Sequence, residues 1–224
     1  MTGPRRVWVT RAEPGAGRTA ARLRERGFEP VVAPLIAVSP IVQPEPNLSD
    51  VAALAFTSVN GVAAFAALTA ERDLPVFTVG DGTAAAARRF GFVEVRSADG
   101  ALGDLARLLE TNGIEGVVLA AVAREPAGDL AGLVPTVRVR PLAVYAASET
   151  GAAAPEDVDA VLLHSARSAR ALARLWRGMA ARPAVFALSE AVAGPMRPLV
   201  SPVVAAQPRE ADLLEALGNP APRV

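Results

Sequence analysis

The sequence predicts an α/β protein with two similar domains, each built on a parallel sheet. Short runs of β-branched and apolar residues alternate with alanine- and arginine-rich stretches of helical periodicity, a pattern typical of βαβ units. Three strand–turn–helix segments recur in the same order about half the chain length apart, which indicates a repeated unit. Two proline-containing stretches, residues 30–40 and 136–145, are expected to be extended and to lie outside central sheet positions, as a two-stranded hinge between the domains.

The expected strands are short apolar runs bounded by glycine, proline and polar residues. They cover residues 6–10, 31–33, 51–56, 76–79, 93–95, 116–121, 158–163, 184–188 and 203–205. The expected helices combine a capping residue, a periodic apolar face and a terminal breaker. They cover residues 14–26, 59–70, 82–90, 101–111, 165–176, 190–199 and 209–217.

The repeat is seen in three pairs of segments that keep the same order. Residues 55–58 resemble 162–165, residues 76–84 resemble 185–193, and residues 11–14 resemble 123–126. Each pair places a turn after an expected strand and before an expected helix, so the two halves of the chain are expected to share one topology.

Composition excludes several classes of function. The 23 basic and 23 acidic side chains cancel, so no global field attracts nucleic acid or an anionic membrane, and neither is expected as a partner. No apolar run is long enough to cross a bilayer or to serve as a secretory signal, which predicts a cytoplasmic protein. With no cysteine, one histidine and no lysine, the chain lacks the residues for disulfides, thiol nucleophiles, Schiff bases and common metal sites. We expect neither a metal nor a cofactor.

Several expected strand-to-helix turns carry polar residues that suit an anionic ligand. Thr57-Ser58 and Ser165 start helices, where free amides and the helix dipole favour an anion. An N-cap role is favoured for them and is compatible with anion binding. The turn at residues 80–83 lacks the full dinucleotide fingerprint, so NAD binding is not predicted. Arg11 lies in a glycine-containing turn that a solvated loop also explains. Since ligands bind beyond the carboxyl ends of parallel strands, such turns facing one another across a hinged cleft suit a polycarboxylate or polyphosphate.

Two single residues have open interpretations. His164 follows an expected strand, and a hydrogen-bonded, partly buried histidine is favoured over a catalytic one. Tyr145 ends the second extended stretch, where it either projects into the cleft or packs at an interface. An unperturbed phenol has a pKa of about 10 and is protonated at neutral pH, which makes this type of side chain a hydrogen donor rather than a base.

Short motifs that are weak alone occur in a specific order. They are VWVTR at 7–11, PLI at 34–36, FTSVNGV at 56–62, VGDGTA at 79–84, PLAVY at 141–145 and HS at 164–165. In this order and spacing the sequence resembles the uroporphyrinogen-III synthase family over nearly the whole chain.

The resemblance implies a fold, a substrate and a reaction. It implies two flavodoxin-like or Rossmann-like domains joined by a two-stranded β-ladder, one formed by residues 1–35 and 148–224 and the other by 36–147. The implied substrate is hydroxymethylbilane, a linear tetrapyrrole rich in carboxylates. The implied enzyme is a monomeric, cofactor-independent hydro-lyase that closes this substrate to uroporphyrinogen III with inversion of ring D, in heme, siroheme or cobalamin biosynthesis.

The resemblance also assigns roles to particular residues. It maps the catalytic tyrosine of the family onto Tyr145. The expected substrate-binding residues are Thr10, Arg11, Thr57, Ser58, Gly80, Gly82, Thr83, Arg124, Ser165 and Ser189.

The sequence departs from the family pattern at three places. The turn 120–123 lacks the frequent glycine and arginine arrangement, although Arg124 is adjacent. Ala146-Ala147 replace an arginine and a hydroxyl residue, and Ala191-Val192 replace a pair of threonines. These changes leave open a reduced activity. Two alternatives also stay open, a non-catalytic two-domain binder or sensor of a polycarboxylate metabolite and a flavodoxin-like binder of flavin or nucleotide.

Overall fold

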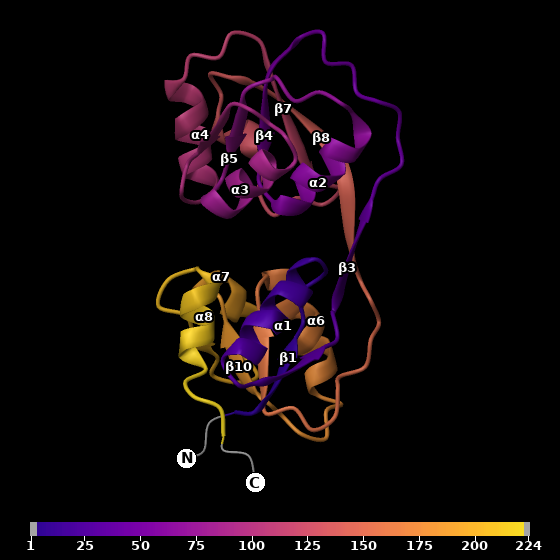
Figure 1. Ribbon diagram of the computed structural model, residues 1–224, viewed down its shortest axis with the longest axis vertical. Coiled ribbons are helices and arrows are strands. Elements are labelled where there is room, and N and C mark those ends of the chain that lie inside the picture. The colour runs from indigo at the N-terminus through magenta and orange to yellow at the C-terminus, as the bar shows by residue number, and fades with distance from the viewer. Residues whose placement is uncertain (1–3, 222–224) are drawn as a thin grey trace. The chain divides into compact units, whose positions relative to one another are not determined.

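A computed structural model describes residues 4–221 of the chain (Figure 1). The chain divides into two compact units, Met1–Ala37 with Ser148–Val224 (unit 1) and Val38–Ala147 (unit 2). The first predicted domain includes residues 1–3 and 222–224, which lie outside the described residues. The prediction of a mixed α/β protein with parallel sheets is confirmed.

Unit 1 is built on a five-stranded sheet. Its strands are β1 (Arg6–Val9), β2 (Glu29–Val32), β9 (Ala160–Leu163), β10 (Ala184–Ala187) and β11 (Val203–Val204). They pair in parallel in the order β11-β10-β9-β1-β2, which is the strand order of flavodoxin-like sheets. The order reverses between β1 and β9, so the carboxyl ends of these two strands form the switch point of the sheet, where ligands bind in such folds.

Helices cover both faces of this sheet (Figure 1). They are α1 (Gly15–Glu25), α6 (Ala166–Trp176), α7 (Glu190–Ala193), the 3₁₀ helix η1 (Gly194–Met196) and α8 (Glu210–Ala216). On one face Val7 and Leu162 pack with Leu23 of α1 and Leu213 of α8. Because side chains alternate along a strand, the fully buried Trp8 points to the opposite face, the one that α6 covers.

Unit 2 is built on a six-stranded sheet. Its strands are β3 (Ile36–Pro40), β4 (Val51–Phe56), β5 (Val76–Thr78), β6 (Val95–Ser97), β7 (Val117–Ala123) and β8 (Arg138–Glu149). The order is β3-β8-β7-β4-β5-β6. The repeated sequence segments equate β4 with β9, β5 with β10 and β7 with β1. The strands β8-β7-β4-β5-β6 then occupy the same places as β2-β1-β9-β10-β11, and the switch point of unit 2 lies between β7 and β4.

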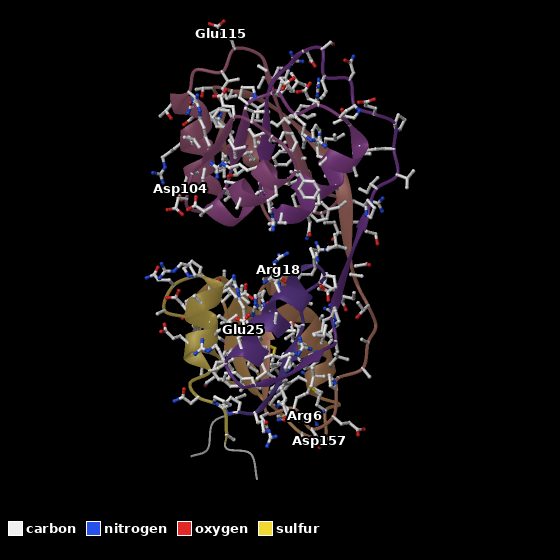
Figure 2. The ribbon with its side chains drawn as sticks, in the orientation of Figure 1. Arg6, Arg18, Glu25, Asp104, Glu115 and Asp157 are labelled. Carbon is white, nitrogen blue, oxygen red and sulfur yellow. The ribbon has the colours of Figure 1, made fainter. Side chains whose placement is uncertain are left out.

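The two faces of this sheet carry separate cores. The helices α2 (Val59–Leu68) and α3 (Asp81–Arg89) enclose an aromatic cluster in which Phe56 lies 5.6 Å from both Phe65 and Phe92, measured between ring centroids. On the other face α4 (Leu102–Thr111) and α5 (Leu130–Leu133) pack against the neighbouring residues of the same strands, such as Ala55. Charged side chains lie outside these cores, as Figure 2 shows for Glu115.

The prediction that residues 136–145 avoid an inner sheet position is wrong. Residues 138–145 lie in β8, which stands between β3 and β7, and Pro141 pairs with Ala120 in the middle of the β7 ladder. Each amide of an inner strand faces only one neighbouring strand, so the missing N–H of a single proline removes one hydrogen bond at most. The pairing continues on both sides of it.

Other predicted elements change in length or position. The stretch 30–40 forms two strands, β2 and β3, in the sheets of different units. The expected strand 93–95 begins at Val95, and the short helix α5 was not predicted. The expected helix 190–199 gives way after four residues to η1, because Pro195 at its start has no N–H to continue an α-helix.

Candidate functional site

Ser58 lies at the switch point of unit 2, between the end of β4 and the start of α2. Its extended backbone brings the side chain over the first turn of the helix, where Oγ accepts the N–H of Gly61 at 3.1 Å. The N-cap interpretation of Ser58 is therefore confirmed. The hydroxyl is only half-buried and has capacity for a further hydrogen bond.

Gly61 allows α2 to approach β7 at this switch point. A Cβ atom at this position would lie 2.7 Å from the carbonyl oxygen of Ala121, which is closer than two such atoms can approach. The glycine therefore fixes how near Ser58 lies to the carboxyl end of β7.

We expect Gly61→Ala to lower the free energy of unfolding by about 1–3 kcal/mol, because the extra methyl group overpacks the contact with β7. Urea denaturation measures this change. Gly103→Ala in α4 is the matched control, because open space surrounds that position and alanine there stabilises the helix by about 0.5–1 kcal/mol. Equal effects of the two substitutions would show that the contact with Ala121 does not limit α2.

Tyr145 contacts Ser58 directly. Its hydroxyl oxygen lies 2.9 Å from Ser58 Oγ, and the residue is only 9% exposed, with its ring in the core beneath α2. The register of β8 shifts just before it, so that Ala143 pairs with Val122 but Tyr145 pairs with Ala123. This bulge breaks the alternation of the strand and turns Val144 and Tyr145 into the same core.

The other predicted residues of unit 2 lie in the turns that follow β4, β7 and β5. Arg124 is exposed, and its amide donates to the carbonyl of Tyr145 at 2.8 Å. Thr57 is half-buried before Ser58, and Thr83 is buried in the first turn of α3. A Cβ atom at Gly80 or Gly82 would meet no protein atom within 4 Å, so packing does not require glycine at either position.

In unit 1 the side chain of Thr10 lies inside the sheet. Thr10 is fully buried, and its hydroxyl donates to the carbonyl of Leu162 at 2.7 Å. The hydroxyl therefore links β1 to β9 inside the sheet and is not accessible to a ligand.

Arg11 lies against the start of α1 rather than in open solvent. A Cβ atom at Gly15 would be 2.5 Å from Arg11 Nε, and Arg11 Nη1 lies 3.6 Å from Glu210 Oε1. Burial lowers the pKa of Arg11, and the charge of Glu210 opposes that effect. An anionic ligand would therefore compete with Glu210 for this guanidinium.

His164 is buried without the hydrogen bonds that its sequence position predicts. Within residues 4–221 neither ring nitrogen has a hydrogen-bond partner, and Nε2 lies 3.8 Å from Glu210 Oε1. Burial lowers the pKa of His164 to about 3, and the charge of Arg11 acts in the same direction. The imidazole is therefore neutral at physiological pH.

Sequence reasoning missed Glu210, which connects several of these residues. Its carboxylate contacts Arg11, Arg22 and His164, and it accepts a hydrogen bond from the hydroxyl of Thr19. The only signal in the sequence was that Glu210 lies in the first turn of an expected helix. An acidic residue is common there because it interacts favourably with the helix dipole, so the position does not indicate a functional role.

Ser165 and Ser189 are N-caps in unit 1. Ser165 Oγ accepts the amide of Ser168 at 3.1 Å at the start of α6, and Ser189 Oγ accepts that of Val192 at 3.4 Å before the short α7. Both are half-buried. Ser165 lies at the switch point of its sheet, in the place that Ser58 has in unit 2.

In residues 4–221 there is no group of three histidine, cysteine or acidic side chains that could hold a metal ion. In the same range no helix combines the length and the apolar character needed to cross a membrane.

Fold and site together define an α/β protein with two flavodoxin-like sheets whose polar side chains gather at the carboxyl ends of the strands. The model of one family, described as uroporphyrinogen-III synthase HemD, matches residues 17–215. The chain belongs to the uroporphyrinogen-III synthase family, which confirms the resemblance found in its sequence.

Solved structures agree with this assignment at the level of the fold. A uroporphyrinogen-III synthetase from Helicobacter pylori is 16% identical with a TM-score of 0.69, and the match covers 94% of this chain and 96% of that one. A mutant uroporphyrinogen III synthase from Thermus thermophilus is 20% identical with a TM-score of 0.57, and covers the same shares. No curated protein matches the chain closely enough to count as a relative. Family membership supports the predicted function in tetrapyrrole biosynthesis and does not favour the non-catalytic alternative.

Proposed function

We propose that the chain is a hydro-lyase that cyclises hydroxymethylbilane to uroporphyrinogen III. Family membership supports the overall reaction, and the contact between Tyr145 and Ser58 is the observation that carries the assignment of residues. This contact joins a weak acid to a helix N-terminus at a switch point, where an anionic ligand is expected to bind.

The proposed reaction asks mainly for positioning. The hydroxyl group on ring A leaves, the pyrrole nitrogen stabilises the resulting cation, and attack by the substituted position of ring D gives a spiro intermediate that rearranges. Because the pyrrole nitrogen already stabilises the cation, the protein must mainly hold ring D for attack and give one proton to the hydroxyl, which leaves as water. The proton that the macrocycle loses after the rearrangement restores the donor.

The geometry around Ser58 suits Tyr145 to this donation. Ser58 Oγ accepts the N–H of Gly61, and its own proton is free to point at the phenol oxygen 2.9 Å away. In that arrangement the phenol proton of Tyr145 is directed to the substrate. The leaving group is proposed to take this proton.

Substrate carboxylates are proposed to bind at the helix N-termini. The open space around Gly80 and Gly82 leaves room for a ligand beside the amides of α3, and Thr83 lies in the same turn. Thr57, Arg124, Ser165, Ser189 and Arg11 complete the proposed contacts, and Thr10 is left out. We also propose that residues 1–35 and 148–224 form one domain and that residues 36–147 form the other. The strands that join the two domains act as the hinge.

The decisive experiment is a product analysis. Purified protein is incubated with hydroxymethylbilane generated enzymatically, the products are oxidised, and isomers I and III are separated. We expect isomer III in excess, with only isomer I in a control that contains heat-denatured protein. Isomer I alone in both samples would overturn the proposed activity.

A further inference from the structure

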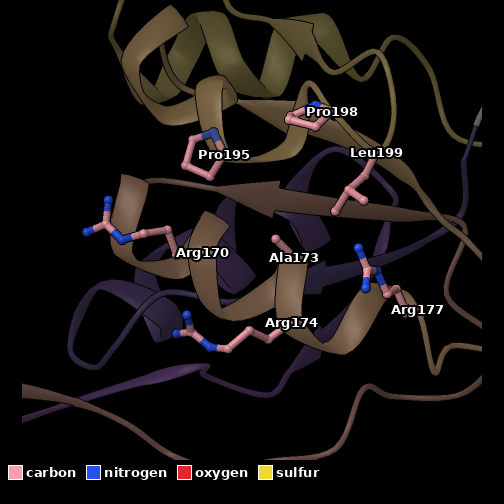
Figure 3. A pocket seen from close by; sticks show the side chains of 7 residues that line it. All are labelled: Arg170, Ala173, Arg174, Arg177, Pro195, Pro198 and Leu199. Carbon is pink, nitrogen blue, oxygen red and sulfur yellow. The ribbon is translucent and has the colours of Figure 1, made fainter.

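A pocket of about 500 Å³ lies on unit 1 between α6 and the segment around η1 (Figure 3). Its lining combines charged and apolar side chains. These are Arg170, Ala173, Arg174, Arg177, Pro195, Pro198 and Leu199. None of them belongs to the turns at the carboxyl ends of the strands, because those on α6 lie beyond its first turn and the others follow α7.

Two of the three arginines, Arg170 and Arg174, are one turn apart on α6, where like charges on a helix repel one another. The third, Arg177, is the C-cap residue that follows the helix, and its guanidinium lies apart from the other two (Figure 3). The helix dipole favours cations near the last turn, which accounts for Arg174 and Arg177 but not for Arg170. Helix stability therefore does not explain the complete cluster.

The charge of this cluster is only partly neutralised. Arg174 Nε donates to Glu149 Oε2 at 3.2 Å, whereas Arg170 and Arg177 have no ion-pair partner within residues 4–221. Both are exposed, and no acidic side chain lines the pocket. The pocket thus presents two guanidinium groups that are available to an anion.

The opposite wall is apolar. Pro195 and Pro198 have no amide N–H and a fixed φ, so they offer a rigid surface without donors, and Leu199 extends it. Guanidinium groups bind carboxylates through paired hydrogen bonds and also stack on flat apolar groups. The volume lies within the range of small-molecule sites rather than of extended macromolecular surfaces.

We propose that this pocket binds a small organic anion, a flat apolar body that carries one or two carboxylates. The carboxylates lie between Arg170 and Arg177, and the apolar body lies against the proline wall. This site is separate from the proposed cyclisation site and does not depend on that activity.

The test uses naphthalene-2,6-dicarboxylate as the probe and the full chain as the protein. Titration is followed by NMR through the side-chain Nε–H signals of the arginines. We expect saturable shifts at Arg170, Arg174 and Arg177, and no comparable shift at Arg24 in the last turn of α1 or at Arg26, its C-cap. Absence of shifts at millimolar probe, or equal shifts at all exposed arginines, would overturn the proposal.

A double variant tests the charge requirement. We expect R170Q/R177Q to weaken binding of the probe by about tenfold or more, as the loss of charge-assisted hydrogen bonds predicts. The matched control R24Q/R26Q removes the same charge from unit 1 and should bind as the wild type does. Equal affinity of R170Q/R177Q and wild type would contradict the proposal, as would equally tight binding of uncharged dimethyl naphthalene-2,6-dicarboxylate. If the double variant fails to fold, the shifts in the wild-type protein decide.

Discussion

Replacing Tyr145 by phenylalanine is expected to lower the turnover number for uroporphyrinogen III by about 10²-fold, at the low end of general acid–base effects. The low end applies because the pyrrole nitrogen already assists departure of the hydroxyl. Substrate binding should weaken by less than about tenfold, which is the value of one neutral hydrogen bond. Initial rates of isomer III formation, corrected for spontaneous isomer I, give kcat and KM separately.

The fold should tolerate this substitution. The ring of Tyr145 stays in the core beneath α2, and Ser58 Oγ keeps its bond to the amide of Gly61. Ser58→Ala is the matched control because it removes the neighbouring hydroxyl and leaves the phenol in place. It should cost about 1 kcal/mol of stability through loss of the N-cap, and reduce turnover less than Tyr145→Phe does.

Two results would change this interpretation. Unchanged turnover in Tyr145→Phe would remove Tyr145 from the mechanism. An equal loss in Ser58→Ala, Tyr145→Phe and the double variant would show that the two hydroxyl groups act as one unit, whereas multiplying losses would show independent roles.

Local patterns in the sequence were sufficient to predict the strands and helices that position the site. The apolar run 51–56 followed by a capping serine predicts β4 and the start of α2, and the same pattern predicts β9 and α6. Repetition of these units also indicates which strands occupy equivalent places in the two sheets. These features depend on residues close in the chain, which is why periodicity and capping predict them.

The details that complete the site depend on contacts that are distant in the chain. The bulge that turns Tyr145 toward Ser58 follows from the pairing of β8 with β7, and nothing in the motif PLAVY indicates an irregular register. Glu210 reaches Arg11 and Thr19 across most of the chain length. The burial of His164 likewise follows from the packing of separate segments. Its place in the sequence predicted a hydrogen-bonded imidazole, but within residues 4–221 its ring nitrogens have no hydrogen-bond partner.

His164 is expected to make the fold sensitive to acid. Its pKa is about 3 in the folded protein and 6.5 as an ordinary value, so between these limits the unfolded chain binds a proton that the folded protein does not. Stability from this group is thus complete above pH 6.5 and decreases as the pH falls toward 3, by about 1.4 kcal/mol per pH unit. In His164→Leu this contribution is absent, so the free energy of unfolding of the variant should rise relative to wild type as the pH falls.

The comparison must separate His164 from the groups that face it. The carboxylate of Glu210 lies 3.8 Å from the imidazole, and the charge of Arg11 also acts on it. The free energy of unfolding is therefore also compared between Glu210→Gln and the double variant Glu210→Gln/His164→Leu. The pH dependence of the difference between these two proteins belongs to the histidine. Because the chain has a single histidine, its ring proton signal also reports this pKa directly by NMR. A midpoint near 6.5 in the folded protein, with a flat stability difference from pH 7 to 4, would mean that the imidazole is hydrated rather than buried.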